Sequence, residues 1–166
     1  MDSILSRRSV RKYTDEPVSE ETVTGLLRAA MAAPSACDER PWHFVVVRDR
    51  GTLEHIASTQ STATMAREAR LAIVVCGDLD LERAAGYWVQ DCAAAIENIL
   101  IAANAEGLGS VWCGIYPVDH RVANFRSLLG LPDQVIPLGA IMLGYPAERL
   151  PPADRYRPDR VHQDRW

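Results

Sequence analysis

The sequence lacks several features that would place it in a specialised class. No apolar run approaches the ~20 residues that span a membrane, and the basic N-terminal residues are not followed by the apolar stretch of a targeting peptide. We therefore expect a cytoplasmic protein. No two of its four cysteines form a CxxC pair, and no histidine stands at a metal-ligand spacing from another ligand type. We expect no metal site, buried free thiols at Cys76, Cys92 and Cys113, and a loop position for Cys37.

The chain also lacks a basic excess. Its formal net charge is -4 and its isoelectric point is about 5.5. A protein that binds nucleic acid over a broad face normally carries a positive balance there, so we exclude nucleic acid as a partner. The 166 residues suggest one domain, and the 48% apolar content is sufficient for a packed core.

Helical and strand patterns alternate along the chain and indicate an α+β or α/β domain. The strand 71–78 is apolar throughout and is expected to be buried on both faces. The helix 84–106 is apolar nearly all round, so it lies at the centre of the fold or faces a partner subunit. The expected helices are 19–33, one from 53 onward, 84–106 and 119–130, and the expected strands are 43–49, 71–78, 110–116 and 135–146.

Positive charge is concentrated in RRSVRKY, residues 7–13. Arginine guanidinium groups and a serine hydroxyl are suitable donors for phosphate oxygens. If this segment is extended, Arg7, Ser9 and Arg11 point to one side. The alternative is a solvated basic terminus without a ligand.

Three further stretches suggest ligand contacts. In APSACDERPWHF, residues 33–44, small side chains would let a flat ligand approach the backbone. EGLGSVWCGIYP, residues 106–117, follows a helix and precedes a strand, so it is not the G-x-G-x-x-G fingerprint of a dinucleotide-binding unit. The proline-rich tail 146–166 is dense in arginine and ends in Trp166, which is typical of an arm that docks on another surface.

The chain resembles the nitroreductase family of flavin enzymes over nearly its whole length. The resemblance is carried by a series of short motifs that occur in this order: RRSVRKY, APSA, RPWHF, GLGSVWCGIYP, LGYP and the tail ending in tryptophan. The resemblance implies an α+β fold with a central mixed β-sheet flanked by helices. It further implies a single domain, 1–166, in an intertwined homodimer, with a C-terminal arm at about 146–166 docking on the partner. One FMN would be bound at each of two interface sites.

The resemblance also implies roles for individual residues. The N-terminal cations and serine would hold the phosphate, ribityl chain and pyrimidine edge of FMN, and Arg155 would be a second phosphate clamp. The loop after the first helix would lie along the isoalloxazine from the partner subunit, and the strand from 112 would pass on its other side. The residues in these roles are Arg7, Arg8, Ser9, Arg11 and Arg155, then Pro34, Ser35 and Ala36, and then Trp112, Cys113, Gly114 and Ile115.

The sequence departs from the family pattern at two places. Asp38-Glu39-Arg40 replaces the usual Asn-x-Gln, so Arg40 would take the position of an amide near the cofactor. A cation there would stabilise the anionic reduced flavin and raise its potential. Ala153 stands where the tail often carries a lysine, which would weaken the phosphate clamp.

The implied activity is a two-step transfer of hydride from NAD(P)H to FMN and then to a small acceptor, such as a nitroaromatic compound or a quinone. The flavin would carry the chemistry, so no side chain is expected to be catalytic. The alternative is an FMN-binding or flavin-sequestering protein with little turnover.

Overall fold

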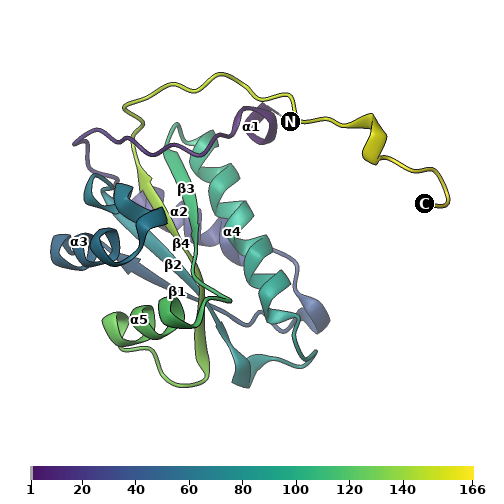
Figure 1. Ribbon diagram of the computed structural model, residues 1–166, viewed down its shortest axis with the longest axis horizontal. Helices are drawn as coiled ribbons and strands as arrows, with labels where there is room; N and C mark the ends of the chain where they lie inside the picture. The colour runs from purple at the N-terminus through teal and green to yellow at the C-terminus, as the bar shows by residue number, and fades with distance from the viewer. Residues whose placement is uncertain (1) are drawn as a thin grey trace.

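The computed structural model of the protein describes residues 2–166 and has a four-stranded sheet at its centre (Figure 1). The strands run in the order β1-β2-β4-β3, and each neighbouring pair is antiparallel. The strands are β1 Trp42–Val47, β2 Leu71–Asp78, β3 Gly109–Gly114 and β4 Val135–Gly144. The helices are α1 Asp2–Ser6, α2 Glu20–Met31, α3 Arg50–Thr59, α4 Trp88–Ala105 and α5 Asp119–Leu129.

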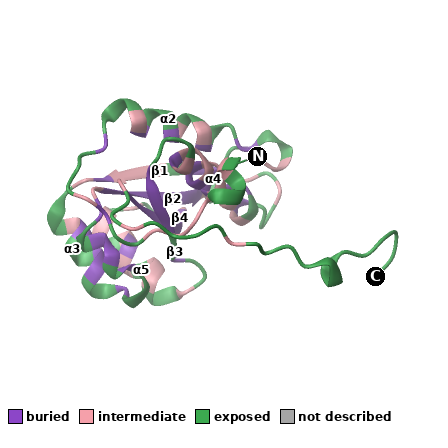
Figure 2. Cartoon of the chain, turned by 90° about the horizontal axis from the view of Figure 1, so that it is seen from above, coloured by how far each residue is buried: buried purple, intermediate pink, exposed green. Residues whose placement is uncertain are grey.

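Helices cover both faces of this sheet, as Figure 2 shows from above. Alternate residues of a strand point to opposite faces. Leu71, Ile73 and Val75 of β2 therefore pack with α2 and α4, while the residues between them pack with α3 and α5. The prediction that 71–78 is buried on both faces is confirmed, and so is the α+β class.

The expected mixed character of the sheet is corrected. Among residues 2–166, the only parallel pairing is an isolated bridge between Ser9 and Ser110. Apolar periodicity reports which face a residue occupies but not the direction of the strand, so the sequence could not settle this point.

The central helix begins later than expected, at Trp88 rather than 84. Gly86 adopts a left-handed conformation, with φ of 87°, which interrupts the helical pattern. The Glu82 carboxylate accepts the backbone N–H groups of Gly86 and Trp88, and this stabilises the turn that leads into α4. Helix α1 was not anticipated from the sequence.

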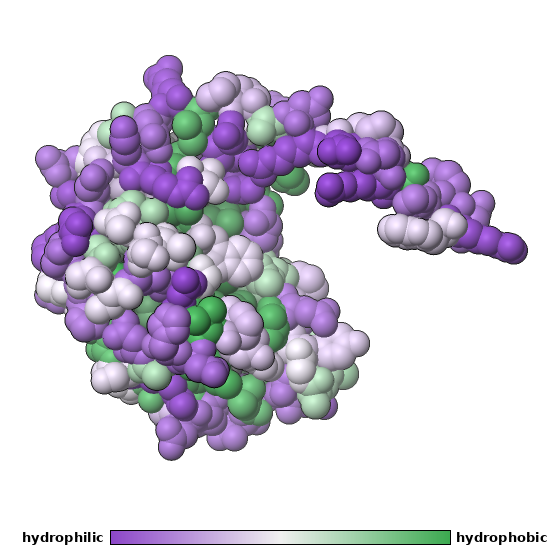
Figure 3. Space-filling model, viewed as in Figure 1, coloured by the Kyte–Doolittle hydropathy of each residue, from purple (hydrophilic) through white to green (hydrophobic). Residues whose placement is uncertain are grey.

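The two ends of the chain run antiparallel to one another. The N–H of Thr14 donates to Tyr145 O at 2.9 Å, and the N–H of Ala147 donates to Lys12 O at 2.9 Å. The tail passes α1 before its end extends away from the body, and beyond Pro151 it contains only one short turn, Pro158–Arg160, in agreement with its predicted irregularity (Figure 1). The space-filling view shows open space between this mainly hydrophilic tail and the body beside α4 (Figure 3).

Among residues 2–166, no helix combines the length and the hydropathy that would be needed to cross a bilayer.

Tight packing between β2 and α4 makes Gly77 a test of the fold. A Cβ added at this glycine would overlap the indole of Trp88. We expect Gly77→Ala to lower the free energy of unfolding by about 1–3 kcal/mol through overpacking, measured by chemical denaturation. Gly25→Ala is the control, because Gly25 is an exposed position inside α2 with no atom near the added Cβ. It should raise stability by up to ~1 kcal/mol. A Gly77→Ala variant as stable as the wild type would contradict this packing.

Candidate functional site

Paired chain ends create a cavity that contains an arginine from each end. The cavity has a volume of about 420 Å³ and is lined by Arg7 and Arg155. Arg7 is held in place by an ion pair with Glu97 of α4, with Nε and Oε1 3.3 Å apart. Two arginines against one acidic residue, Asp154, give the lining of this cavity a net positive charge, which favours an anionic ligand. The remaining lining residues are Ile4, Leu5, Pro152, Ala153, Asp154 and Tyr156.

Arg8 and Arg11 point elsewhere. Arg8 Nη1 donates to Pro151 O and ties the N-terminal segment to the tail, while its buried Nε has no partner within residues 2–166. The Arg11 guanidinium donates to Ser9 O at 3.3 Å and lines a separate cavity of about 500 Å³. Ser9 joins the segment to β3 through its bridge to Ser110. The structure thus brings Arg7 and Arg155 together and leaves Arg8 and Arg11 outside their cavity.

A third cavity lies between the loop after α2 and the first turns of α4. It has a volume of about 300 Å³ and is lined by Pro34, Ser35 and Ala36 together with Tyr87, Gln90, Asp91 and Ala94. The Ser35 hydroxyl accepts the N–H of Arg40 at 3.0 Å, so it is engaged within the loop. The shape and mainly apolar lining of this cavity are compatible with one face of a flat ligand.

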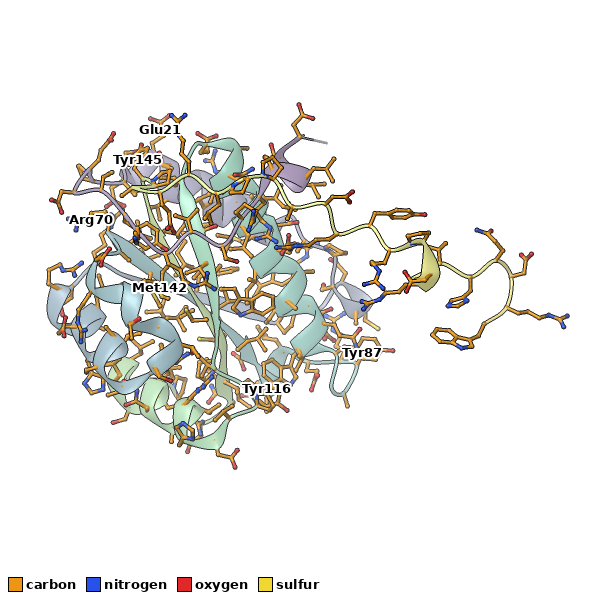
Figure 4. All side chains as sticks on the ribbon, turned by 45° about the horizontal axis from the view of Figure 1, so that its top comes forward. Glu21, Arg70, Tyr87, Tyr116, Met142 and Tyr145 are labelled. Carbon is orange, nitrogen blue, oxygen red and sulfur yellow. The ribbon has the colours of Figure 1, made fainter. Side chains whose placement is uncertain are left out.

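Exposed aromatic rings lie near this end of α4. Figure 4 shows Tyr87 and Tyr116 in the same region of the molecule. The Tyr116 ring packs edge-on against Trp88, with ring centroids 5.0 Å apart. Both tyrosines are partly exposed and can provide apolar contact area to an aromatic ligand.

The loop from 35 to 40 has an unusual backbone. Cys37, Asp38 and Arg40 all have positive φ, at 50°, 52° and 48°. A non-glycine residue in this region costs on the order of 1–3 kcal/mol, so surrounding contacts must hold the conformation. Such strain often accompanies functional sites.

Two buried carboxylates provide those contacts. Glu39 Oε2 accepts the N–H groups of Arg83 and Ala84 at 2.7 and 2.9 Å. Asp91 Oδ1 accepts the N–H of Ala36 at 3.0 Å. The two backbone hydrogen bonds lower the pKa of Glu39, whereas burial raises the pKa of Asp91. The sequence analysis missed this pair. The available signal for Asp91 was that it is the one charged residue among residues 88–96.

Arg40 pairs with its neighbour in the loop. Its Nε and Nη2 donate to the two carboxylate oxygens of Asp38, each at 2.7 Å, and both side chains are exposed. This bidentate pair lowers the pKa of Asp38. The positive charge of Arg40 is therefore matched locally, and its expected effect on a flavin stays a prediction.

Strand β3 is an edge strand with part of its outer side open. Ser110 O accepts the N–H of Val10, so by the two-residue period the backbone of Trp112 faces the same outer side. The Gly114 carbonyl accepts from Gln60 and Arg121. The Ile115 N–H already donates to Leu138 O at 3.1 Å, so it is not free for a ligand.

The side chains of this strand differ in exposure. The Trp112 indole is partly exposed and lies over Gly139, whereas Cys113 and Ile115 are buried. Burial raises the pKa of Cys113 to about 11. A ligand beside β3 would thus contact the Trp112 ring and backbone rather than Cys113 or Ile115 side chains.

The four cysteines should react very differently with a thiol reagent. All four are free, and only Cys37 is exposed, as the sequence led us to expect. Burial raises the pKa of Cys76 to about 12, and that of Cys92 still higher, so these thiols stay protonated and inaccessible. We expect one fast-reacting thiol per native chain at neutral pH and four after denaturation, measured with a chromogenic disulfide reagent. Cys37→Ser should abolish the fast reaction; fast labelling of that variant would contradict the burial of the others.

Comparisons with known proteins agree with this architecture. The sequence profile described as "Nitroreductase family" matches residues 4–72 and 52–145. A protein of Methanothermobacter thermautotrophicus, provisionally named an NADH dehydrogenase/NAD(P)H nitroreductase, is 49% identical over 166 residues, covering 100% of this chain and 87% of the relative.

Solved structures give the same result. A crystal structure from Parabacteroides distasonis, of a protein with the same provisional name, is 44% identical, covers 99% of this chain and 97% of its own, and has a TM-score of 0.96. A provisionally named nitroreductase from Desulfovibrio desulfuricans, solved in complex with FMN, is 30% identical, with coverages of 99% and 96% and a TM-score of 0.86.

Proposed function

The chain belongs to the nitroreductase family, and we propose on this basis that it transfers electrons from NAD(P)H to a small organic acceptor through bound FMN. It is an NAD(P)H-dependent flavin oxidoreductase, as its relatives are. The observation that carries the proposal is the convergence of Arg7 and Arg155, from opposite ends of the chain, on one cavity.

The residues present fit FMN in three respects. Arg7 and Arg155, which line one cavity, match a phosphate in charge and carry the N–H donors that a phosphate accepts. The cavity beside Pro34 and Ala36 is mainly apolar, as the flat face of an isoalloxazine requires. The open outer edge of β3 at Trp112 offers backbone groups to the polar rim of the ring.

The protein's own groups bind and orient the reactants in this proposal. FMN, when bound, supplies the two-electron transfer between nicotinamide and acceptor. Arg7 and Arg155 anchor its phosphate, and Glu97 fixes the orientation of the Arg7 side chain. Tyr87 and Tyr116 provide apolar surface for the ring of an aromatic acceptor, which supports nitroaromatic compounds and quinones as the acceptor class.

We also propose that the protein is a homodimer in which the arm 146–166 docks on the partner subunit. Several apolar side chains are exposed on the single chain, among them Ile4, Leu5 and Met31. The tail extends from the body with Trp166 fully exposed at its end (Figure 1). Exposed apolar groups of this size favour burial against a second copy. Sedimentation equilibrium tests this arrangement directly.

The phosphate clamp can be tested with a matched pair of tail variants. Arg155 lines the cavity, whereas Arg157, two residues further on, forms an ion pair with Asp159 at 2.9 Å. We expect Arg155→Ala to weaken FMN binding by roughly ten- to a hundredfold, because hydrogen bonds to a charged group contribute about 1.5–3 kcal/mol. Arg157→Ala should bind FMN as the wild type does. Flavin fluorescence titration measures both, and equal affinities in the two variants would refute the clamp.

Turnover distinguishes the oxidoreductase from a protein that only stores flavin. Under anaerobic conditions, NADH or NADPH should bleach the FMN absorption of the purified protein. Adding a nitroaromatic compound or a quinone should then restore the colour over many cycles. A flavin-loaded protein whose colour is unchanged by both nicotinamides would instead support the sequestering alternative. Stopped-flow absorbance gives the rates of the two half-reactions separately.

A further inference from the structure

Glu39 and Asp91 form a buried carboxylate pair to which the proposed binding of FMN has so far given no role. Glu39 is 8% exposed and Asp91 is 5% exposed, so both are almost fully buried. Each carboxylate uses one oxygen to accept backbone N–H groups. The other two oxygens, Glu39 Oε1 and Asp91 Oδ2, are buried without a hydrogen-bond donor among residues 2–166. Buried polar atoms are normally paired, so two unpaired oxygens in one pair of residues point to a shared physical cause.

A single proton satisfies both unpaired oxygens at once. The two carboxyl groups are brought to one place, because Asp91 Oδ1 accepts the N–H of Ala36, three residues before Glu39, and each carboxyl group shifts the pKa of the other. Two ionised carboxylates have no donor and repel each other, whereas one protonated group donates an O–H to the other. Aspartic dyads that share a proton follow the same rule.

We propose that Glu39 and Asp91 share one proton, and that this hydrogen bond holds the loop 35–40 in its left-handed conformation against α4. Three segments meet at the pair. Asp91 belongs to α4 and binds the loop at Ala36, and Glu39 belongs to the loop and binds the segment before α4 at Arg83 and Ala84. Both residues are positioning residues, since neither is required to touch a substrate.

Burial and the surrounding charges both favour Asp91 over Glu39 as the group that carries the proton. Burial is the main cause that raises the pKa of Asp91, and the negative charges of Glu39 and Glu82 act in the same direction, while the Ala36 N–H opposes them. The pKa of Glu39 is lowered by the N–H groups of Ala84 and Arg83, and the Arg83 charge adds to this effect. On the loop, the remaining charges of Asp38 and Arg40 pair with each other.

The directions of these two pKa changes determine how the stability of the folded protein depends on pH. A carboxyl group with a raised pKa in the folded protein binds its proton more tightly than in the unfolded chain. Folding is therefore disfavoured progressively as pH rises from the ordinary aspartate range through the raised pKa of Asp91. Glu39 has the opposite dependence, because its lowered pKa adds stability that is lost only as pH falls through that lowered value.

Asp91→Asn tests whether a proton holds the two carboxyl groups together. The asparagine oxygen can still accept the Ala36 N–H, and its NH₂ group donates permanently to Glu39, as the protonated carboxyl would. The denaturation midpoint of the full-length wild type should fall relative to that of Asp91→Asn as pH rises from weakly acidic to alkaline values. Asp119→Asn is the matched control, because Asp119 is also in the first turn of its helix but is exposed. Its difference from the wild type should not change over this range.

A spectroscopic measurement identifies the proton itself. Infrared difference spectra between the wild type and Asp91→Asn, at neutral pH, should contain the carbonyl stretch of one protonated carboxyl group. This band should be absent from the difference between the wild type and Asp119→Asn. The proposal would be overturned by two results together. The difference in denaturation midpoint between the wild type and Asp91→Asn would be the same at every pH, and the infrared difference spectrum would contain no band of a protonated carboxyl group.

The shared proton should also affect FMN binding, because Asp91 lines the cavity beside Pro34 and Ala36. This expectation rests on the proposed function. Loss of the shared proton should loosen this loop, so FMN affinity of the wild type should fall at alkaline pH more than that of Asp91→Asn. Equal pH profiles for FMN affinity in the two proteins would show that the pair does not act on the cavity. If FMN does not bind at any pH, the proposed function fails, while the stability and infrared measurements still decide whether the proton is shared.

Discussion

Pairing between the two ends of the chain is the constraint on which the cavity lined by Arg7 and Arg155 depends. Residues 8–14 and 145–151 run antiparallel, and β3 anchors the first of these segments through Ser9 and Ser110. Because both segments are fixed to the sheet, the arginines just beyond the paired region are brought to the same place. Arg7 and Arg155, although far apart in the sequence, can therefore contact the same anion.

The second part of the site depends on α4. Its first turns border the cavity beside Pro34, and further along the helix Glu97 orients Arg7. Residues 94 and 97 are three apart and so lie on the same side of a helix. One largely apolar helix thus contributes to both regions of a single subunit, the cavity beside Pro34 and the ion pair that holds Arg7.

The sequence predicted the four strands, the helices after α1 and the family, but it did not indicate the Glu39–Asp91 pair. The continuous apolar run of β2 was sufficient to infer burial on both faces, because period and length are local properties. Strand direction and the late start of α4 depend on contacts elsewhere, including the Glu82 carboxylate. The role of Glu39 was not predictable for the same reason. Glu39 is notable only because it lies beside Asp91, which is far along the chain. Nothing in the local sequence pattern indicates that these two residues are neighbours in the fold.

The strained loop has a consequence for how the protein is made. Its conformation is held by hydrogen bonds between Ala36 and Asp91 and between Glu39 and Arg83, across sequence separations of 55 and 44 residues. During synthesis on a ribosome, the loop emerges well before the helix that stabilises it. The nascent chain must therefore carry this segment in other conformations until α4 appears, and the cavity beside Pro34 forms only as the second half of the domain is added.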